Sequence, residues 1–66
     1  MTHKEFETIE PGDLLTWSVL PDVMDFGIVL AIRKEEIMIM WNQDRDQVYW
    51  YNWDSIARPS YWSIVR

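Results

Sequence analysis

Apolar and polar residues alternate along short stretches of the chain, and this two-residue period is typical of β-strands. In the segment DLLTWSVL, Leu15, Trp17 and Val19 fall on one face and the residues between them fall on the other. The segment IMIMW is apolar throughout, and neither segment carries the apolar stripe of an amphipathic helix. Five strands are therefore predicted, at residues 13–20, 26–33, 37–41, 47–53 and 61–65.

Turn residues and one glycine refine this layout. Pro11-Gly12 is a turn dipeptide that separates an N-terminal arm, residues 1–11, from the strands. Gly27 lies inside the second predicted strand, where it indicates a β-bulge or a close approach of another segment to the backbone.

A short helical turn is expected before the last strand. Asp54 has the side chain of a helix cap, the following residues continue to Arg58, and Pro59 ends the turn. Five short strands with one helical or 3₁₀ turn before the fifth predict an all-β domain, a small closed or nearly closed barrel over residues 12–66.

The composition excludes several kinds of chemistry. A chain of 66 residues and 8.0 kDa has room for one domain. It has no cysteine, so thiol nucleophiles and zinc–thiolate sites are excluded. Its single histidine, His3, is three residues from the start, which argues against a serine–histidine triad. Asp22 and Asp25 are three residues apart, but no nucleophile or oxyanion donor accompanies them. We expect neither an enzyme nor a bound cofactor, and we expect His3 to be a solvated residue.

The formal net charge of −5 limits the choice of partner. A surface that follows phosphates or anionic lipid needs clustered lysine and arginine, so nucleic acid and membranes are disfavoured and a partner with a basic surface is favoured. Acidic residues dominate the first half of the chain. There is neither a membrane-spanning apolar run nor the pattern of a signal peptide, which favours an intracellular protein or a component of a virion.

The order of these segments resembles a known fold family. The segments GDLLTW, GIVLAI, IMIMW and VYW, with Ile56 after them, are similar to the strands of SH3-like barrels and, more narrowly, to small SH3-like proteins of tailed phages, including cyanophages. The resemblance covers residues 12–65 and implies a five-stranded SH3-like barrel. It also implies a phage-encoded protein that binds peptides, nucleic acids or neighbouring subunits, and it does not choose among them. The chain lacks the basic loop of nucleic-acid-binding barrels.

Aromatic and methionine residues provide the candidate binding surface. If the residues that alternate with them pack inward, one outward face combines side chains that are enriched at protein interfaces. The acidic residues Asp22 and Asp25 lie in a loop that we expect to orient a basic partner. The candidate face consists of Met38, Met40, Tyr49, Tyr51 and Trp53.

This face leaves several alternatives open. The N-terminal arm could fold over it through Phe6 and Ile9, or the face could mediate self-association. Single-stranded nucleic acid could stack on Tyr49, Tyr51 and Trp53, although that surface needs cationic neighbours.

A sharper alternative is an aromatic cage for methylated lysine, with Asp22 or Asp25 beside Trp17 and either Trp53 or Tyr51. Such a cage needs three ring faces around one cavity. Metal binding is not expected, because the acidic stretch Asp44-Arg45-Asp46 lacks the glycine and the further oxygen ligands of a calcium loop and is predicted to be a solvated hairpin tip.

Overall fold

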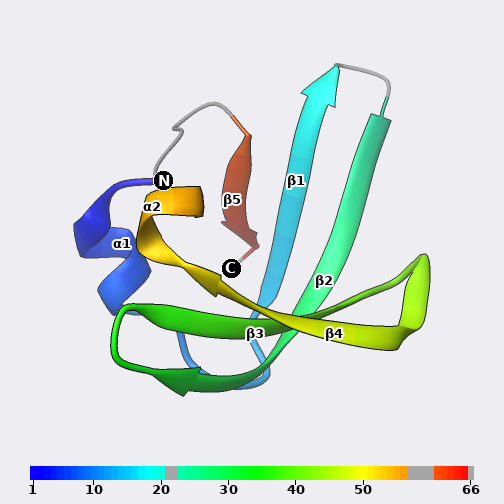
Figure 1. The fold of residues 1–66 in the computed structure, drawn as a ribbon. Helices are drawn as coiled ribbons and strands as arrows, with labels where there is room; N and C mark the ends of the chain where they lie inside the picture. The colour runs from blue at the N-terminus through cyan, green and yellow to red at the C-terminus, as the bar shows by residue number, and fades with distance from the viewer. Residues whose placement is uncertain (21–22, 57–60, 66) are drawn as a thin grey trace.

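Five strands and two short helices make up the computed structural model, which describes residues 1–20, 23–56 and 61–65 (Figure 1). The predicted strands are all present, with ends that differ from the predicted ones by a few residues, so the all-β prediction is confirmed. Within the described residues, neither helix is long and apolar enough to span a membrane. In chain order the elements are α1 (His3–Glu7), β1 (Leu14–Leu20), β2 (Val23–Arg33), β3 (Glu36–Trp41), β4 (Asp44–Asn52), α2 (Trp53–Ile56) and β5 (Trp62–Val65).

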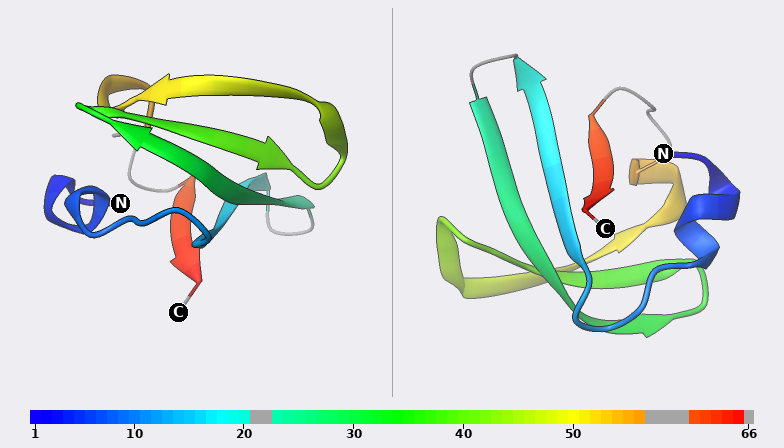
Figure 2. Two further views of the ribbon diagram at one scale, coloured as in Figure 1. Left: turned by 90° about the horizontal axis from the view of Figure 1, so that it is seen from below. Right: turned by 180° about the vertical axis from the view of Figure 1, so that it is seen from behind.

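The strands form one antiparallel sheet in the order β4-β3-β2-β1-β5. The long strand β2 pairs with β1 over its first half and with β3 over its second half, and the sheet curls strongly between the two pairings. Figure 2 shows the β3–β4 hairpin turned across β1 and β2. Strands β4 and β5 are the two edges, and in the described part of the chain no strand pairing joins them, so the curled sheet is not closed.

The bend in β2 includes Gly27, where the backbone lies against β3. A Cβ atom added to Gly27 would come within 2.5 Å of Cγ2 of Ile39 and 2.9 Å of Cε3 of Trp41. The pairing of β2 with β3 then shifts between Val29 and Ala31. The close approach predicted at Gly27 is therefore confirmed, and it lets the Trp41 ring pack directly on the β2 backbone.

The bulge after Gly27 changes the face on which β2 side chains lie. Ile28 is opposite Met40, on the outer, convex face of the sheet. Ile32 is opposite the buried Ile37, on the inner, concave face. A strict two-residue period would have placed Ile28 and Ile32 on the same face, so the extra residue in the ladder reverses the alternation.

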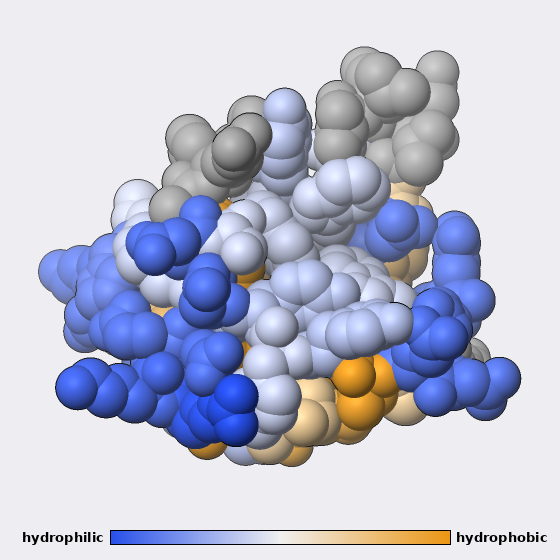
Figure 3. Space-filling model, in the orientation of Figure 1, coloured by the Kyte–Doolittle hydropathy of each residue, from blue (hydrophilic) through white to orange (hydrophobic). Residues whose placement is uncertain are grey.

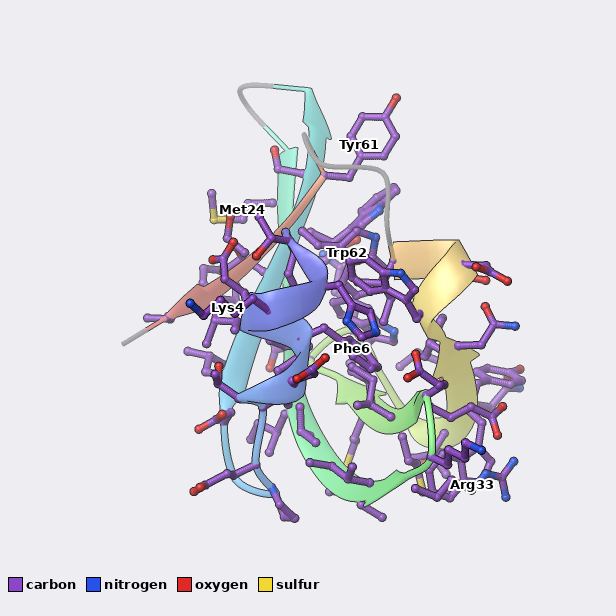
Figure 4. The ribbon with its side chains drawn as sticks, turned by 90° about the vertical axis from the view of Figure 1, so that its left-hand side faces the viewer. Lys4, Phe6, Met24, Arg33, Tyr61 and Trp62 are labelled. Atoms are coloured by element: carbon purple, nitrogen blue, oxygen red, sulfur yellow. The ribbon has the colours of Figure 1, made fainter. Side chains whose placement is uncertain are left out.

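The core fills the inner face of the sheet, and the N-terminal segment covers it. Figure 4 shows Phe6 on the side of α1 that faces α2, whereas Lys4 lies on the opposite side. Thr2 and Glu5 form a capping box, in which each side chain accepts a hydrogen bond from the backbone N–H of the other residue. The buried apolar residues are Met1, Phe6, Ile9, Leu15, Val29, Ile37, Ile39, Ile56 and Trp62.

The helical turn before the last strand is present, but its start differs from the prediction. Helix α2 begins at Trp53, and the side-chain carbonyl of Asn52 accepts a hydrogen bond of 2.9 Å from the backbone N–H of Ser55. The helix cap is therefore Asn52 rather than Asp54, because α2 begins at the residue that directly follows Asn52, the last residue of β4. The predicted stop at Pro59 lies outside the described residues.

Gly27→Ala tests the close contact between β2 and β3. We expect the free energy of unfolding to fall by about 1–3 kcal/mol, because the added methyl group overlaps Ile39 and Trp41. Urea denaturation followed by tryptophan fluorescence measures the change. Gly12→Ala is the comparison, since nothing lies within 4 Å of a Cβ there and only the positive φ of 97° is unfavourable. An unchanged midpoint for Gly27→Ala would contradict the close packing.

Candidate functional site

The predicted binding face is divided between the two faces of the sheet. Tyr49 is opposite Ile39 and Tyr51 is opposite Ile37, so both tyrosines belong to the inner face. Met38 is opposite Trp50, on the outer face. The prediction that Met38, Met40, Tyr49, Tyr51 and Trp53 share one outward face is therefore wrong. The β3–β4 pairing shifts between Ile39 and Trp41, so the alternation along β4 is opposite to the one assumed.

Trp53 is half-buried beneath the N-terminal helix. The Phe6 ring lies 5.2 Å from the Trp53 ring, and His3 meets Trp53 edge-on at 4.9 Å between ring centroids. Phe6 and Ile9 are buried, so the N-terminal segment covers Trp53, whereas the alternative predicted that it would cover the whole candidate face. Tyr49, in contrast, is exposed and donates a hydrogen bond to the side-chain carbonyl of Gln47. The three rings proposed as a nucleic-acid stacking platform therefore lie in three different environments.

The outer face of the sheet carries a band of apolar side chains. Strand register places Val65 beside Leu14, Leu14 beside Ile28, and Ile28 beside Met40, so one row crosses four strands. Side chains that are directly opposite on neighbouring strands lie within contact distance. Phe26 and Met38 flank this row on β2 and β3. The outer apolar face, as used below, consists of Leu14, Phe26, Ile28, Met38, Met40 and Val65.

Part of the outer apolar face is hollowed. A groove of about 490 Å³ is lined by Leu14, Phe26, Ile28 and Met40, together with Trp41 and Asn42. Beyond Met38, the guanidinium group of Arg33 lies 3.9 Å from the Trp50 ring centroid and is hydrogen-bonded to Glu36. The signal for this face in the sequence is the alternation of Met24, Phe26 and Ile28 with Gly27 and Val29, and the predicted binding face did not include these residues.

The inner face carries a second cavity, of about 430 Å³, at the end of the core nearest the β3–β4 turn. All five strands contribute to it. Asp25 from the predicted acidic loop is one of its residues, whereas Asp22 lies outside the described residues. Figure 3 shows residues of near-neutral hydropathy over the middle of this side of the molecule, with hydrophilic residues on both flanks. The inner aromatic pocket is lined by Trp17, Asp25, Trp41, Gln43, Asp44, Tyr51 and Trp62.

Three rings of the inner aromatic pocket contact one another at large angles. The ring centroids of Trp41 and Tyr51 are 6.3 Å apart at 90°, and those of Trp41 and Trp62 are 5.5 Å apart at 51°. Tyr51 and Trp62 are 5.8 Å apart at 61°. The indole N–H of Trp41 donates a hydrogen bond of 2.9 Å to the hydroxyl of Tyr51, which fixes both rings. Trp62 is buried, so the pocket has a rigid aromatic base.

His3 connects the N-terminal helix to the turn between β2 and β3. Its Nδ1 lies 2.8 Å from Oε1 of Glu7, and its Nε2 lies 3.1 Å from Oε2 of Glu35. Glu35 has a positive φ of 57°, and its carbonyl accepts a hydrogen bond from the backbone N–H of Trp53. The hydrogen bond to Glu35, with the charges of both carboxylates, raises the pKa of His3 above 6.5. The His3 side chain is 42% exposed, in agreement with the expectation of a solvated residue, but it also pairs with two carboxylates.

The described residues contain no group of three or more histidine and carboxylate side chains placed to share a metal ion. Asp44 and Asp46 are exposed, as predicted, but they belong to the beginning of β4 rather than to a hairpin tip.

No protein-family model, curated protein or solved structure matches the chain.

Tyr51→Phe tests the inward orientation of Tyr51. The substitution removes the acceptor of the Trp41 indole N–H, and we expect the free energy of unfolding to fall by about 1 kcal/mol. Thermal denaturation by circular dichroism measures the loss. Tyr49→Phe is the matched control, because Tyr49 is exposed and the loss of its hydroxyl group leaves no buried donor without an acceptor. Equal effects of the two substitutions would contradict the assignment of Tyr51 to the inner pocket.

His3→Gln tests the link between α1 and the β2–β3 turn. Because folding raises the pKa of His3, its contribution to stability is fully present below the unfolded value of 6.5 and is lost as the pH rises through the higher folded value. We expect the melting temperature of the wild type, relative to that of His3→Gln, to be higher at pH 6 than at pH 8.5. A constant difference between the two proteins across this range would contradict the charge-dependent link.

Proposed function

We propose that this protein is a non-enzymatic protein-interaction module that docks on its partner through the outer apolar face. The row from Val65 through Leu14 and Ile28 to Met40 carries this proposal. These residues occupy one face of four neighbouring strands, and Phe26 extends the surface at one side.

Exposure of this face to water has a cost that a partner would remove. Phe26 and Ile28 are each 42% exposed, and Val65 is 48% exposed. Burying apolar surface contributes about 25 cal/mol per Å², and contiguous apolar patches of several hundred Å² on monomeric proteins are often functional. The groove between Leu14 and Met40 offers a recess in which a single apolar side chain of the partner would be buried, as in the centre of many interfaces.

Charge supports a partner with a basic surface. Glu5, Glu7 and Glu10 are exposed along α1 and the segment that follows it. Fields of one sign accelerate association with a surface of the opposite sign and disfavour partners of the same sign. We therefore propose a protein partner with an apolar contact patch and basic residues outside it.

We further propose that the fold is an SH3-like barrel that is open in this chain. The strand order and the helical turn between β4 and β5 support this proposal, and so does the resemblance to small phage proteins. In that setting the partner is a virion subunit at a repeated position or a host protein that the module redirects.

Ile28→Lys tests docking through the outer apolar face, and Ile32→Lys is its matched control. Both isoleucines belong to β2 and both are 42% exposed, but only Ile28 lies on the outer face. Wild-type and variant proteins are used as baits after cross-linking in a lysate of cells that express the protein. We expect the wild type and Ile32→Lys to capture one stoichiometric partner, and we expect Ile28→Lys to capture at least about tenfold less of that partner.

Sedimentation of each bait alone accompanies this experiment. If the wild type sediments as a dimer and Ile28→Lys sediments as a monomer, the partner is a second copy of this chain. Capture that is unaffected by Ile28→Lys would overturn the proposal, provided that the melting temperatures show all three proteins to be folded.

A further inference from the structure

We propose that the inner aromatic pocket binds a methylated ammonium group, such as a trimethylammonium. The pocket lies on the concave side of the sheet, opposite the outer apolar face. Among the described lining residues, Trp41 is shared with the groove of the outer apolar face. The substitutions that test the two sites differ, so either proposal can fail without the other.

The ring arrangement is the first observation. The planes of the Trp41, Tyr51 and Trp62 rings meet at angles between 51° and 90°. The rings are therefore not stacked face to face, and they do not cover one another's faces completely. Trp17 lies beside Trp62 in the β1–β5 register and completes the aromatic lining. The faces of aromatic rings attract cations, most strongly when the site excludes water.

The positions of the carboxylates are the second observation. Asp25 is the cross-strand partner of Trp17, and Asp44 is the cross-strand partner of Trp41. Each carboxylate therefore accompanies one indole at the pocket, and both line the same cavity. The lining side chains that the structure describes include no lysine or arginine. A pocket with aromatic walls and two acidic groups is complementary to an apolar cation.

The size and lining of the cavity favour a methylated ammonium over a primary ammonium. A lysine ammonium is strongly hydrated and needs three hydrogen-bond acceptors. A trimethylammonium carries the same charge without N–H groups, so it loses less hydration in a pocket made mainly of ring carbon. The volume of about 430 Å³ falls within the range of small-molecule sites, which is about 300–1,000 Å³.

The rigidity of the base supports a preformed site. The hydrogen bond between Trp41 and Tyr51 and the burial of Trp62 hold three rings in place without a ligand. Binding to a preformed pocket avoids most of the cost of ordering side chains. The cage predicted from the sequence combined Trp17 and either Trp53 or Tyr51 with Asp22 or Asp25. Trp17, Tyr51 and Asp25 line this cavity, and Trp41 and Trp62 join them in place of Trp53.

Titration with two ligands of the same shape tests the proposal. Choline and its uncharged analogue 3,3-dimethylbutan-1-ol are added to the full chain, and binding is followed by NMR through the indole N–H signals. We expect choline to shift signals of pocket tryptophans with a dissociation constant of about 1 mM or tighter, and the uncharged analogue to bind at least about tenfold more weakly. Equal binding of the two, or no binding of choline, would overturn the proposal.

Asp25→Asn and Asp54→Asn provide the matched variants. Both remove one negative charge, but Asp54 is an exposed residue of α2 and does not line the pocket. We expect Asp25→Asn to weaken choline binding about threefold to fivefold without changing the affinity for the uncharged analogue. An equal loss of choline binding in both variants would reflect net charge and would contradict the site.

A peptide arm identifies the source of the methylated ammonium. Short peptides that contain trimethyllysine or unmodified lysine at the same position are compared with choline. Tighter binding of the trimethyllysine peptide assigns the pocket to a modified protein, and tighter binding of choline assigns it to a small molecule or a headgroup. Binding of the unmodified lysine peptide as tightly as the methylated one would overturn the inference.

Discussion

The close approach of β3 to the β2 backbone at Gly27 is the constraint on which the rest of the structure depends. Because Gly27 has no side chain, Ile39 and Trp41 pack against the strand itself. Strand β2 can then bend and pair with β1 on one half and β3 on the other. The bend brings Trp41 toward Trp62 of the edge strand β5, and the same curl leaves Ile28 on the convex side.

The local sequence was sufficient to predict the strands, their order along the chain and the role of Gly27. These features depend on residue periodicity and on the absence of a side chain, which act within a few residues. The capping box of Thr2 and Glu5 also has a local signature, threonine followed three residues later by glutamate. The prediction of an N-terminal arm over residues 1–11 rests on the Pro11-Gly12 turn and takes no account of this signature.

The assignment of faces could not be predicted in the same way. Irregular pairing near Leu30 and at the beginning of β4 reverses the alternation, and one extra residue is enough to move every later side chain to the other face. For this reason Tyr51 lies inside with Trp41, whereas Met38 stays outside with Trp50. The aromatic pocket depends on contacts among all five strands, and no short segment contains enough information to specify it.

The packing of α1 has a consequence for the order in which the chain acquires structure. Phe6 is synthesised before most of the domain, but Trp53, the ring against which it packs, belongs to the last third of the chain. Strand β1 pairs with β2 soon after it in the chain, but Trp17 meets its other partner, Trp62, only when β5 has been synthesised. Folding that depends on such distant contacts is slow for a small domain, because loop closure must precede the contacts that stabilise it. During synthesis, the N-terminal helix therefore gains its stability only when translation of the domain is nearly complete.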